Sequence, residues 1–170
     1  MDTWRDCSEK GNQAGYTLAV PVEIITDVWL SGCFTGDIAV WCKTNGFTHV
    51  LNAGGAHARE VSYNTEQSLY DIKYMELEIT DRPSQNLSTI LEPSYSFIHD
   101  AIENHGKILI HCVWGQSRSI SCLIYFLMKH SKLSFDRAMT IVKDKKSTVR
   151  LDDAFERQLR LIDYEHRYNL

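Results

Sequence analysis

Residues 111–119, His-Cys-Val-Trp-Gly-Gln-Ser-Arg-Ser, combine side chains that can carry out nucleophilic chemistry on a phosphate. A cysteine and an arginine stand with five residues between them, in a loop that contains glycine. A thiolate is a strong nucleophile, and a guanidinium can bind two phosphate oxygens at once. Glycine permits the tight curvature that curls backbone N–H groups around an anion. The spacing therefore predicts a cradle for a tetrahedral dianion and a cysteine-phosphate intermediate.

Each residue of this loop has an expected role in the reaction. Cys112 is the predicted nucleophile, and Arg118 binds the phosphate and stabilises charge in the transition state. Ser119 donates a hydrogen bond that helps the sulfur leave when the intermediate is hydrolysed. His111 supports the loop through hydrogen bonds rather than acting as a base. The predicted phosphate-binding residues are Val113, Trp114, Gly115, Gln116, Ser117 and Arg118.

Two flanking elements must position this loop. Residues 107–111 form a short, nearly all-apolar run, which is typical of a central parallel strand buried on both faces. Residues 119–128 have a helical pattern, and the N–H groups and dipole of a helix N-terminus favour an anion. The same field favours thiolate over thiol. A loop that leaves the carboxyl end of a parallel strand also lies where open α/β sheets bind ligands.

The departing oxygen of a phosphate ester needs a proton, so a second loop should carry a general acid. Asp81 is the candidate, because it follows a predicted strand at residues 74–79. If that strand is a parallel neighbour of residues 107–111, Asp81 and Cys112 lie at one edge of the sheet. The residues alone leave a second interpretation equally open, in which Asp81 caps a turn before Pro83.

The remaining pattern alternates strands with helices and then continues as helices, which predicts an α/β fold. We expect a mainly parallel sheet of about five strands, flanked by helices. Residues 1–16 are predicted to be a flexible N-terminal tail and residues 17–170 a single domain. Residues 56–70 are expected to be irregular, and Pro93 to mark a first helical turn or a kink. The other expected strands are residues 23–25, 28–30 and 48–52, and the other expected helices are residues 36–45, 86–104, 134–145 and 152–168.

Composition narrows the class of protein. The 170 residues are 44% hydrophobic and 24% charged, with a net charge of −4, which argues against a broad nucleic-acid-binding surface. No apolar run approaches the roughly 18 residues of a membrane span, so no membrane partner is expected. The five cysteines contain no C-x-x-C pair, which argues against a disulfide framework or a zinc site. These features favour a cytoplasmic protein, with the nucleus as a further location.

Residues 111–119 match the HC-x5-R signature of cysteine-dependent protein phosphatases, and residues 117–119 resemble its dual-specificity branch. The resemblance extends over nearly the whole chain. Residues 50–53 resemble the family's strand before the variable loop, and residues 125–128 its helix after the phosphate loop. Residues 155–159 resemble its last helix. The chain thus resembles a small, atypical dual-specificity phosphatase with a phosphotyrosine-phosphatase-like fold.

The resemblance implies a function and assigns residues to it. Asp81 stands where the family keeps its general acid, which favours the acid over the turn cap. The family uses no metal or organic cofactor and acts on phosphotyrosine and on phosphoserine or phosphothreonine. The implied partners are phosphorylated proteins, a kinase among the candidates, and the expected state is a monomer or weak dimer. Leu151-Asp152 replaces the Pro-Asn pair usual before the last helix, and Ala154 replaces the following glycine, so Asp152 is the candidate supporting residue.

Two other functions remain open. A catalytically weak scaffold could bind phosphoproteins on the same fold, although such proteins commonly lose the cysteine or the arginine. The same chemistry could act on a lipid, RNA or glucan phosphate, but Ser117 and the absence of lysine from the loop favour protein substrates. Outside the loop, Cys122 is expected to be a packed helix cysteine rather than a disulfide partner of Cys112. Lys143, Lys145 and Lys146 are expected to form a solvated helix end.

Overall fold

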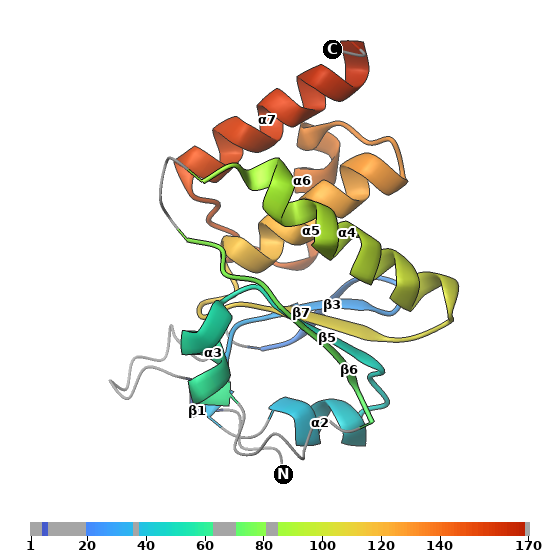
Figure 1. The fold of residues 1–170 in the computed structure, drawn as a ribbon, viewed down its shortest axis with the longest axis vertical. Coiled ribbons are helices and arrows are strands. Elements are labelled where there is room, and N and C mark those ends of the chain that lie inside the picture. The colour runs from blue at the N-terminus through green and yellow to red at the C-terminus, as the bar shows by residue number, and fades with distance from the viewer. Residues whose placement is uncertain (1–4, 7–19, 36–37, 63–70, 81–84, 169–170) are drawn as a thin grey trace.

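A computed structural model of the chain shows a five-stranded sheet between two layers of helices (Figure 1). It describes residues 5–6, 20–35, 38–62, 71–80 and 85–168. The strands of the sheet are β2 (Val22–Ile25), β3 (Val28–Ser31), β5 (His49–Asn52), β6 (Lys73–Glu76) and β7 (Ile108–His111). The helices are α2 (Ile38–Thr44), α3 (Gly55–Ser62), α4 (Leu87–Glu103), α5 (Arg118–His130), α6 (Phe135–Lys145) and α7 (Asp153–Tyr168). A separate two-stranded ladder pairs β1 (Arg5–Asp6) with β4 (Phe34–Thr35).

The strand order β2-β3-β7-β5-β6 makes β7 the central strand, as the sequence predicts. The four strands from β3 to β6 are parallel, and β2 is antiparallel to β3. This confirms the mainly parallel sheet of about five strands. The strands β6 and β7 are parallel but not neighbours, because β5 lies between them. Their carboxyl ends still lie at the same edge of the sheet.

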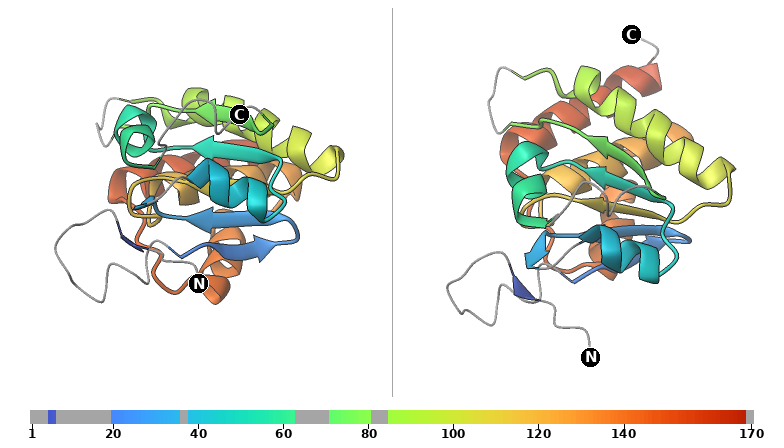
Figure 2. Two further views of the ribbon diagram at one scale, coloured as in Figure 1. Left: turned by 90° about the horizontal axis from the view of Figure 1, so that it is seen from below. Right: turned by 60° about the horizontal axis from the view of Figure 1, so that its bottom comes forward.

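The alternation of side chains along β7 explains why this strand is apolar throughout. Ile108 and Ile110 pack into the larger core, which the sheet shares with α4, α5, α6 and α7. Leu109 points to the opposite face and packs with Ile38 and Val50 in a smaller core beneath α2. Both faces are covered, as Figures 1 and 2 show. The strand thus leads into its loop from a rigid, fully buried position.

The predicted helix boundaries are largely confirmed by caps. Ser134 accepts a hydrogen bond from the Arg137 N–H at 3.1 Å, and α6 begins directly after it. Asp152 does the same for α7, since its Oδ1 accepts from the Ala154 N–H at 2.8 Å. Pro93 lies inside α4, which runs continuously from residue 87 to residue 103.

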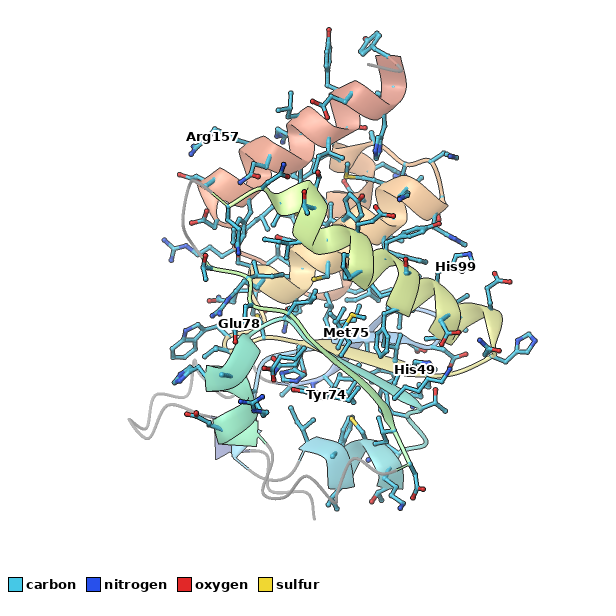
Figure 3. The ribbon with its side chains drawn as sticks, in the orientation of Figure 1. His49, Tyr74, Met75, Glu78, His99 and Arg157 are labelled. Carbon is cyan, nitrogen blue, oxygen red and sulfur yellow. The ribbon has the colours of Figure 1, made fainter. Side chains whose placement is uncertain are left out.

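The expectation that residues 56–70 are irregular is wrong for the first part of this range, where α3 forms. Residues 63–70 lie outside the described part of the chain. The carboxylate of Glu78 accepts the Ala56 N–H at 2.9 Å and so caps α3 from another loop, and Figure 3 shows Glu78 beside this helix. A cap that is distant in sequence leaves no local signal. The predicted strand at 74–79 is shorter than expected and ends at Glu76, because its partner β5 ends at Asn52.

Candidate active site

The 112–118 loop lies at the carboxyl edge of the parallel strands, between β7 and α5. A cavity of about 370 Å³ opens there. One wall comes from this loop and the start of α5, and the other from the segment that leads into α7. The lining residues are Cys112, Trp114, Gln116, Ser117, Arg118, Arg150, Leu151, Asp152 and Asp153.

Cys112 lies deep in this cavity, with 2% of its surface exposed. The N–H of Gly115 points at its sulfur with a distance of 3.2 Å between N and Sγ. The hydroxyl of Ser119, which is fully buried, lies 3.3 Å from the same sulfur. A backbone N–H and a hydroxyl can both hydrogen-bond to a sulfur atom, so both groups contact the reactive atom directly. The structure therefore brings Cys112, Gly115 and Ser119 together.

The tight curvature of the loop depends on Gly115. Its φ of +66° lies in the left-handed region, which side chains other than glycine rarely adopt. A Cβ at this position would lie 2.5 Å from the Gly32 nitrogen and 2.6 Å from the Ser31 carbonyl carbon. The loop therefore packs directly against the end of β3. A backbone hydrogen bond from Cys33 N to Val113 O, at 2.9 Å, fixes this contact.

Residues 148–152 hold the other side of the loop through three hydrogen bonds. The Gln116 side chain donates to the Thr148 carbonyl at 3.2 Å, and Arg150 N donates to the Gln116 carbonyl at 3.1 Å. Asp152 N donates to Ser117 Oγ at 3.0 Å. Ser117 therefore receives a hydrogen bond from this segment instead of capping α5 with its side chain. Asp152 supports the loop with its backbone, while its carboxylate caps α7.

Arg118 and Trp114 form the accessible part of the cavity. Arg118 is partly buried at the first position of α5, and its guanidinium makes no hydrogen bond or ion pair within the described part of the chain. It is therefore available to a phosphate. Trp114 is 45% exposed, an unusual exposure for so large an apolar ring, and it lines the same cavity.

His111 lies beneath the loop and is fully buried. Burial lowers its pKa to about 4, although a hydrogen bond with the Cys112 backbone opposes this change. The imidazole is therefore neutral near pH 7 and contacts the backbone of the nucleophile rather than solvent. This position suits a residue that orients the loop.

Asp81, the predicted general acid, lies outside the described residues, and its role stays a prediction. The Gln85 side chain is hydrogen-bonded to described residues that precede Asp81. This side chain accepts a hydrogen bond from Thr80 N at 2.8 Å and donates one to the Glu78 carbonyl at 3.0 Å. Because β6 and β7 run parallel, the described residues that precede Asp81 leave the sheet at the edge where Cys112 lies.

Sequence reasoning did not predict the positions of two basic residues near the cavity, Lys146 and Arg150. Lys146 was expected at a solvated helix end, but it is 3% exposed, and burial lowers its pKa against a smaller opposing effect of Cys112. Arg150 lines the cavity. The only sequence signal for this placement is that Arg150 stands two residues before Asp152, the cap of α7. Neither position shows a local pattern, because both depend on how residues 146–152 fold back over the 112–118 loop.

The cysteines follow the expectation in part. Cys42, Cys112 and Cys122 form no disulfide bond, whereas Cys33 is disulfide-bonded, which the sequence did not predict. Cys122 is fully buried in α5, and burial raises its pKa to about 12, so its thiol stays protonated at neutral pH. It is thus a packed helix cysteine in this structure.

Within the residues that the structure describes, no three or more His, Cys, Asp or Glu side chains gather as a metal site would require. Over the same residues, no helix has the length and apolar character of a membrane span.

Comparison with known proteins identifies the family. The family model for the dual specificity phosphatase catalytic domain matches residues 28–166. Dual specificity protein phosphatase 1B of Arabidopsis thaliana is 31% identical over 133 residues, which are 75% of this chain and 75% of that protein. Dual specificity protein phosphatase 22-A of Danio rerio is 34% identical over 115 residues, which are 68% of this chain and 51% of that protein. This chain thus spans about half the length of the zebrafish relative.

The fold is also shared with solved structures. A mouse putative dual specificity phosphatase superposes with a TM-score of 0.74 at 20% identity, covering 95% of this chain and 96% of that one. At this identity, the likeness bears on the fold. It agrees with the mainly parallel, five-stranded sheet flanked by helices.

Proposed function

The chain belongs to the dual specificity phosphatase family, and on that premise we propose that it hydrolyses phosphotyrosine and phosphoserine or phosphothreonine in proteins through a cysteinyl-phosphate intermediate. One observation carries the proposal. The Cys112 sulfur lies at the floor of a cavity, with the Gly115 N–H and the Ser119 hydroxyl directed at it and Arg118 beside it. Phosphorylated proteins, kinases among them, are the proposed partners.

The first step transfers the phosphoryl group to the enzyme. The Cys112 thiolate attacks phosphorus, a sulfur–phosphorus bond forms, and the bond from phosphorus to the ester oxygen breaks. Arg118 binds two of the equatorial oxygens, and the loop amides bind the third. These donors are already in position and stabilise the negative charge of the transition state. Asp81 gives its proton to the departing oxygen, which leaves as a phenol or an alcohol.

The second step regenerates the enzyme. Water attacks the phosphorus, and Asp81, now a carboxylate, takes the proton from this water. The sulfur–phosphorus bond breaks, inorganic phosphate leaves, and Cys112 returns to the thiolate. Ser119 helps this step, because its hydroxyl can donate a hydrogen bond to the sulfur as negative charge develops there.

The test is a comparison of the protein with its Cys112→Ser variant on phosphotyrosine peptide, phosphothreonine peptide and phosphoinositide, with chelator present. We expect both peptides to be hydrolysed and the variant to lose activity by about a thousandfold or more, since an alcohol is a far weaker nucleophile than a thiolate. Cys42→Ser is the matched control, because Cys42 is a buried cysteine of α2 outside the cavity.

Three outcomes would contradict the proposal. Turnover that survives in Cys112→Ser would remove the nucleophile from the mechanism. Hydrolysis of the phosphoinositide alone would assign the protein to lipid substrates. Binding of phosphopeptide without any hydrolysis by the unmodified protein would favour a phosphoprotein-binding scaffold.

A further inference from the structure

We propose that Cys33 and Cys7 form a redox-sensitive disulfide that holds the 112–118 loop in place, so that reduction of this bond by a thiol lowers the activity of the site. This inference rests on the proposed function for its effect on activity. The bond is separate from the catalytic chemistry, because neither of its sulfurs is the nucleophile.

The partner of Cys33 follows by elimination. Cys33 is disulfide-bonded, whereas Cys42, Cys112 and Cys122 form no disulfide bond. The chain contains five cysteines, so Cys7 is the one that remains. Cys7 lies outside the described residues, and its part in the bond belongs to the proposal.

The pairing of β1 with β4 supports this connection. The two strands are antiparallel, and Asp6 opposite Phe34 is the last described pair. The next pair in the same register would be position 7 with Cys33. Directly opposed residues of antiparallel strands have Cα atoms about 4.5 or 5.5 Å apart, and a disulfide requires roughly 4.4–6.8 Å. The register of the ladder therefore suits a bond between these two positions.

Cys33 contacts the 112–118 loop directly. Its backbone N–H donates to the Val113 carbonyl at 2.9 Å, and its sulfur lies 3.3 Å from the same oxygen. Its side chain is fully buried and packs with Val113 and with Ala58 of α3. Val113 follows the nucleophile Cys112 in the chain. One hydrogen bond therefore joins the disulfide-bonded residue to the residue beside the nucleophile.

The neighbouring Gly32 extends this contact. A Cβ on Gly32 would lie 3.0 Å from the Trp114 carbonyl carbon and 3.0 Å from the Val113 oxygen. Residues 32–33 and the loop thus pack backbone against backbone. The Gly115 N–H, which points at the nucleophilic sulfur, belongs to the part of the loop that packs here. A shift of residues 32–33 would therefore displace the donors around the sulfur.

The disulfide determines whether β1 stays paired with β4. Their ladder consists of two residue pairs. Even a longer isolated pair of strands is only marginally stable in water. A disulfide favours the paired state, because it restricts the unpaired states of the chain. Once the bond is reduced, we expect β1 to separate from β4 and the contact between Cys33 and Val113 to open more often.

Reduction proceeds by thiol–disulfide exchange, with a thiol as the only co-reactant. Because Cys33 is fully buried, the thiolate of the reductant attacks the Cys7 sulfur, and Cys33 leaves as a thiolate that takes up a proton. A second thiol of the reductant then attacks the reductant's sulfur in the mixed disulfide and releases Cys7, which also takes up a proton. Two electrons pass to the two protein sulfurs, and the reductant becomes a disulfide.

The first measurement counts thiols. The native protein, purified without reductant, is treated with dithiothreitol, desalted under nitrogen, and alkylated in denaturant for mass spectrometry. We expect three alkylated cysteines before the treatment and five after it. Both forms are then assayed on phosphotyrosine peptide, each with Cys112 shown by peptide mapping to be a thiol. We expect kcat to be about tenfold lower in the reduced form, because small displacements of reacting groups have large effects on rate.

Hydrogen exchange supplies a readout that does not depend on activity. The Cys33 amide donates to Val113, so its exchange rate reports on this contact. It should exchange about tenfold faster in the reduced form, because local opening becomes more frequent. Cys7→Ser removes the bond and leaves the Cys33 side chain in place, so it should match the reduced protein and be insensitive to dithiothreitol. Cys42→Ser is the matched control and should respond to dithiothreitol as the unmodified protein does.

The proposal is overturned if the untreated protein already has five thiols, or if native treatment with dithiothreitol leaves the count at three. Equal kcat and equal exchange in the two forms would also overturn it, as would a Cys7→Ser variant that behaves like Cys42→Ser. Failure of the proposed function would look different. Neither form would then hydrolyse the peptide, while exchange of the Cys33 amide would still report whether the disulfide holds the loop.

Discussion

The two edges of the parallel sheet use their polar residues in opposite ways. At the carboxyl edge, Arg118 and Arg150 line a cavity and make no ion pair with the described residues. At the amino edge, His49 bonds to Thr48 Oγ1 at 2.7 Å and to Asp100 at 3.2 Å. Figure 3 shows His49 far along the sheet from Glu78, which follows β6 at the carboxyl edge.

The amino edge contains a hydroxyl, an imidazole and a carboxylate in contact, an arrangement that hydrolases also use. Here the hydroxyl and the carboxylate are also hydrogen-bonded to neighbouring parts of the fold. Thr48 Oγ1 also accepts from Lys107 N at 3.0 Å, and Asp100 accepts from Lys73 at 2.7 Å. Burial lowers the pKa of His49, so its ring is mainly neutral at pH 7. Donors without protein partners, rather than the presence of reactive residue types, therefore mark the functional edge.

The largest expected effect at the carboxyl edge concerns Asp81, the predicted general acid. In Asp81→Asn, we expect kcat for phosphoserine or phosphothreonine peptides to fall by about a thousandfold, because an alkoxide leaves poorly without a proton. Aryl phosphates with good leaving groups should lose far less. A series of aryl phosphates with different leaving-group pKa values measures this difference. Equal losses across the series would remove Asp81 from the role of acid.

A second prediction concerns how the free energy of unfolding depends on pH through His111. Its pKa is about 4 when folded, against 6.5 for the exposed side chain. As pH falls from about 6.5 to about 4, the unfolded chain takes up a proton that the folded chain does not, so stability decreases by roughly 3 kcal/mol. Above pH 6.5 this contribution is constant.

Urea unfolding between pH 7 and pH 4.5 measures this slope. The variant His111→Asn cannot take up the proton and should show a shallower decrease over the same interval, whatever its absolute stability. His49 contributes in the same direction, since its pKa is also lowered, and it is present in both proteins. An identical slope in the two proteins would show that His111 is not the group responsible.

The features that sequence reasoning predicted correctly are those whose cause is local. The apolar run of β7, the caps Ser134 and Asp152, and the glycine of the 112–118 loop each carry their own signal. The features that it missed depend on distant partners. Helix α3 is capped by Glu78, and Arg150 reaches the cavity because its backbone pairs with Gln116.

The smallest effect tests the amino edge itself. Thr48→Val removes the hydroxyl and keeps the shape of the side chain, so the hydrogen bonds to His49 and Lys107 are lost. We expect the free energy of unfolding to fall by about 1 kcal/mol, the usual net value of such bonds. The kcat/KM for phosphopeptides should stay within about twofold, because Thr48 lies at the opposite edge from Cys112. A large loss of activity with unchanged stability would give the two edges a shared chemical role, and the contrast between them would fail.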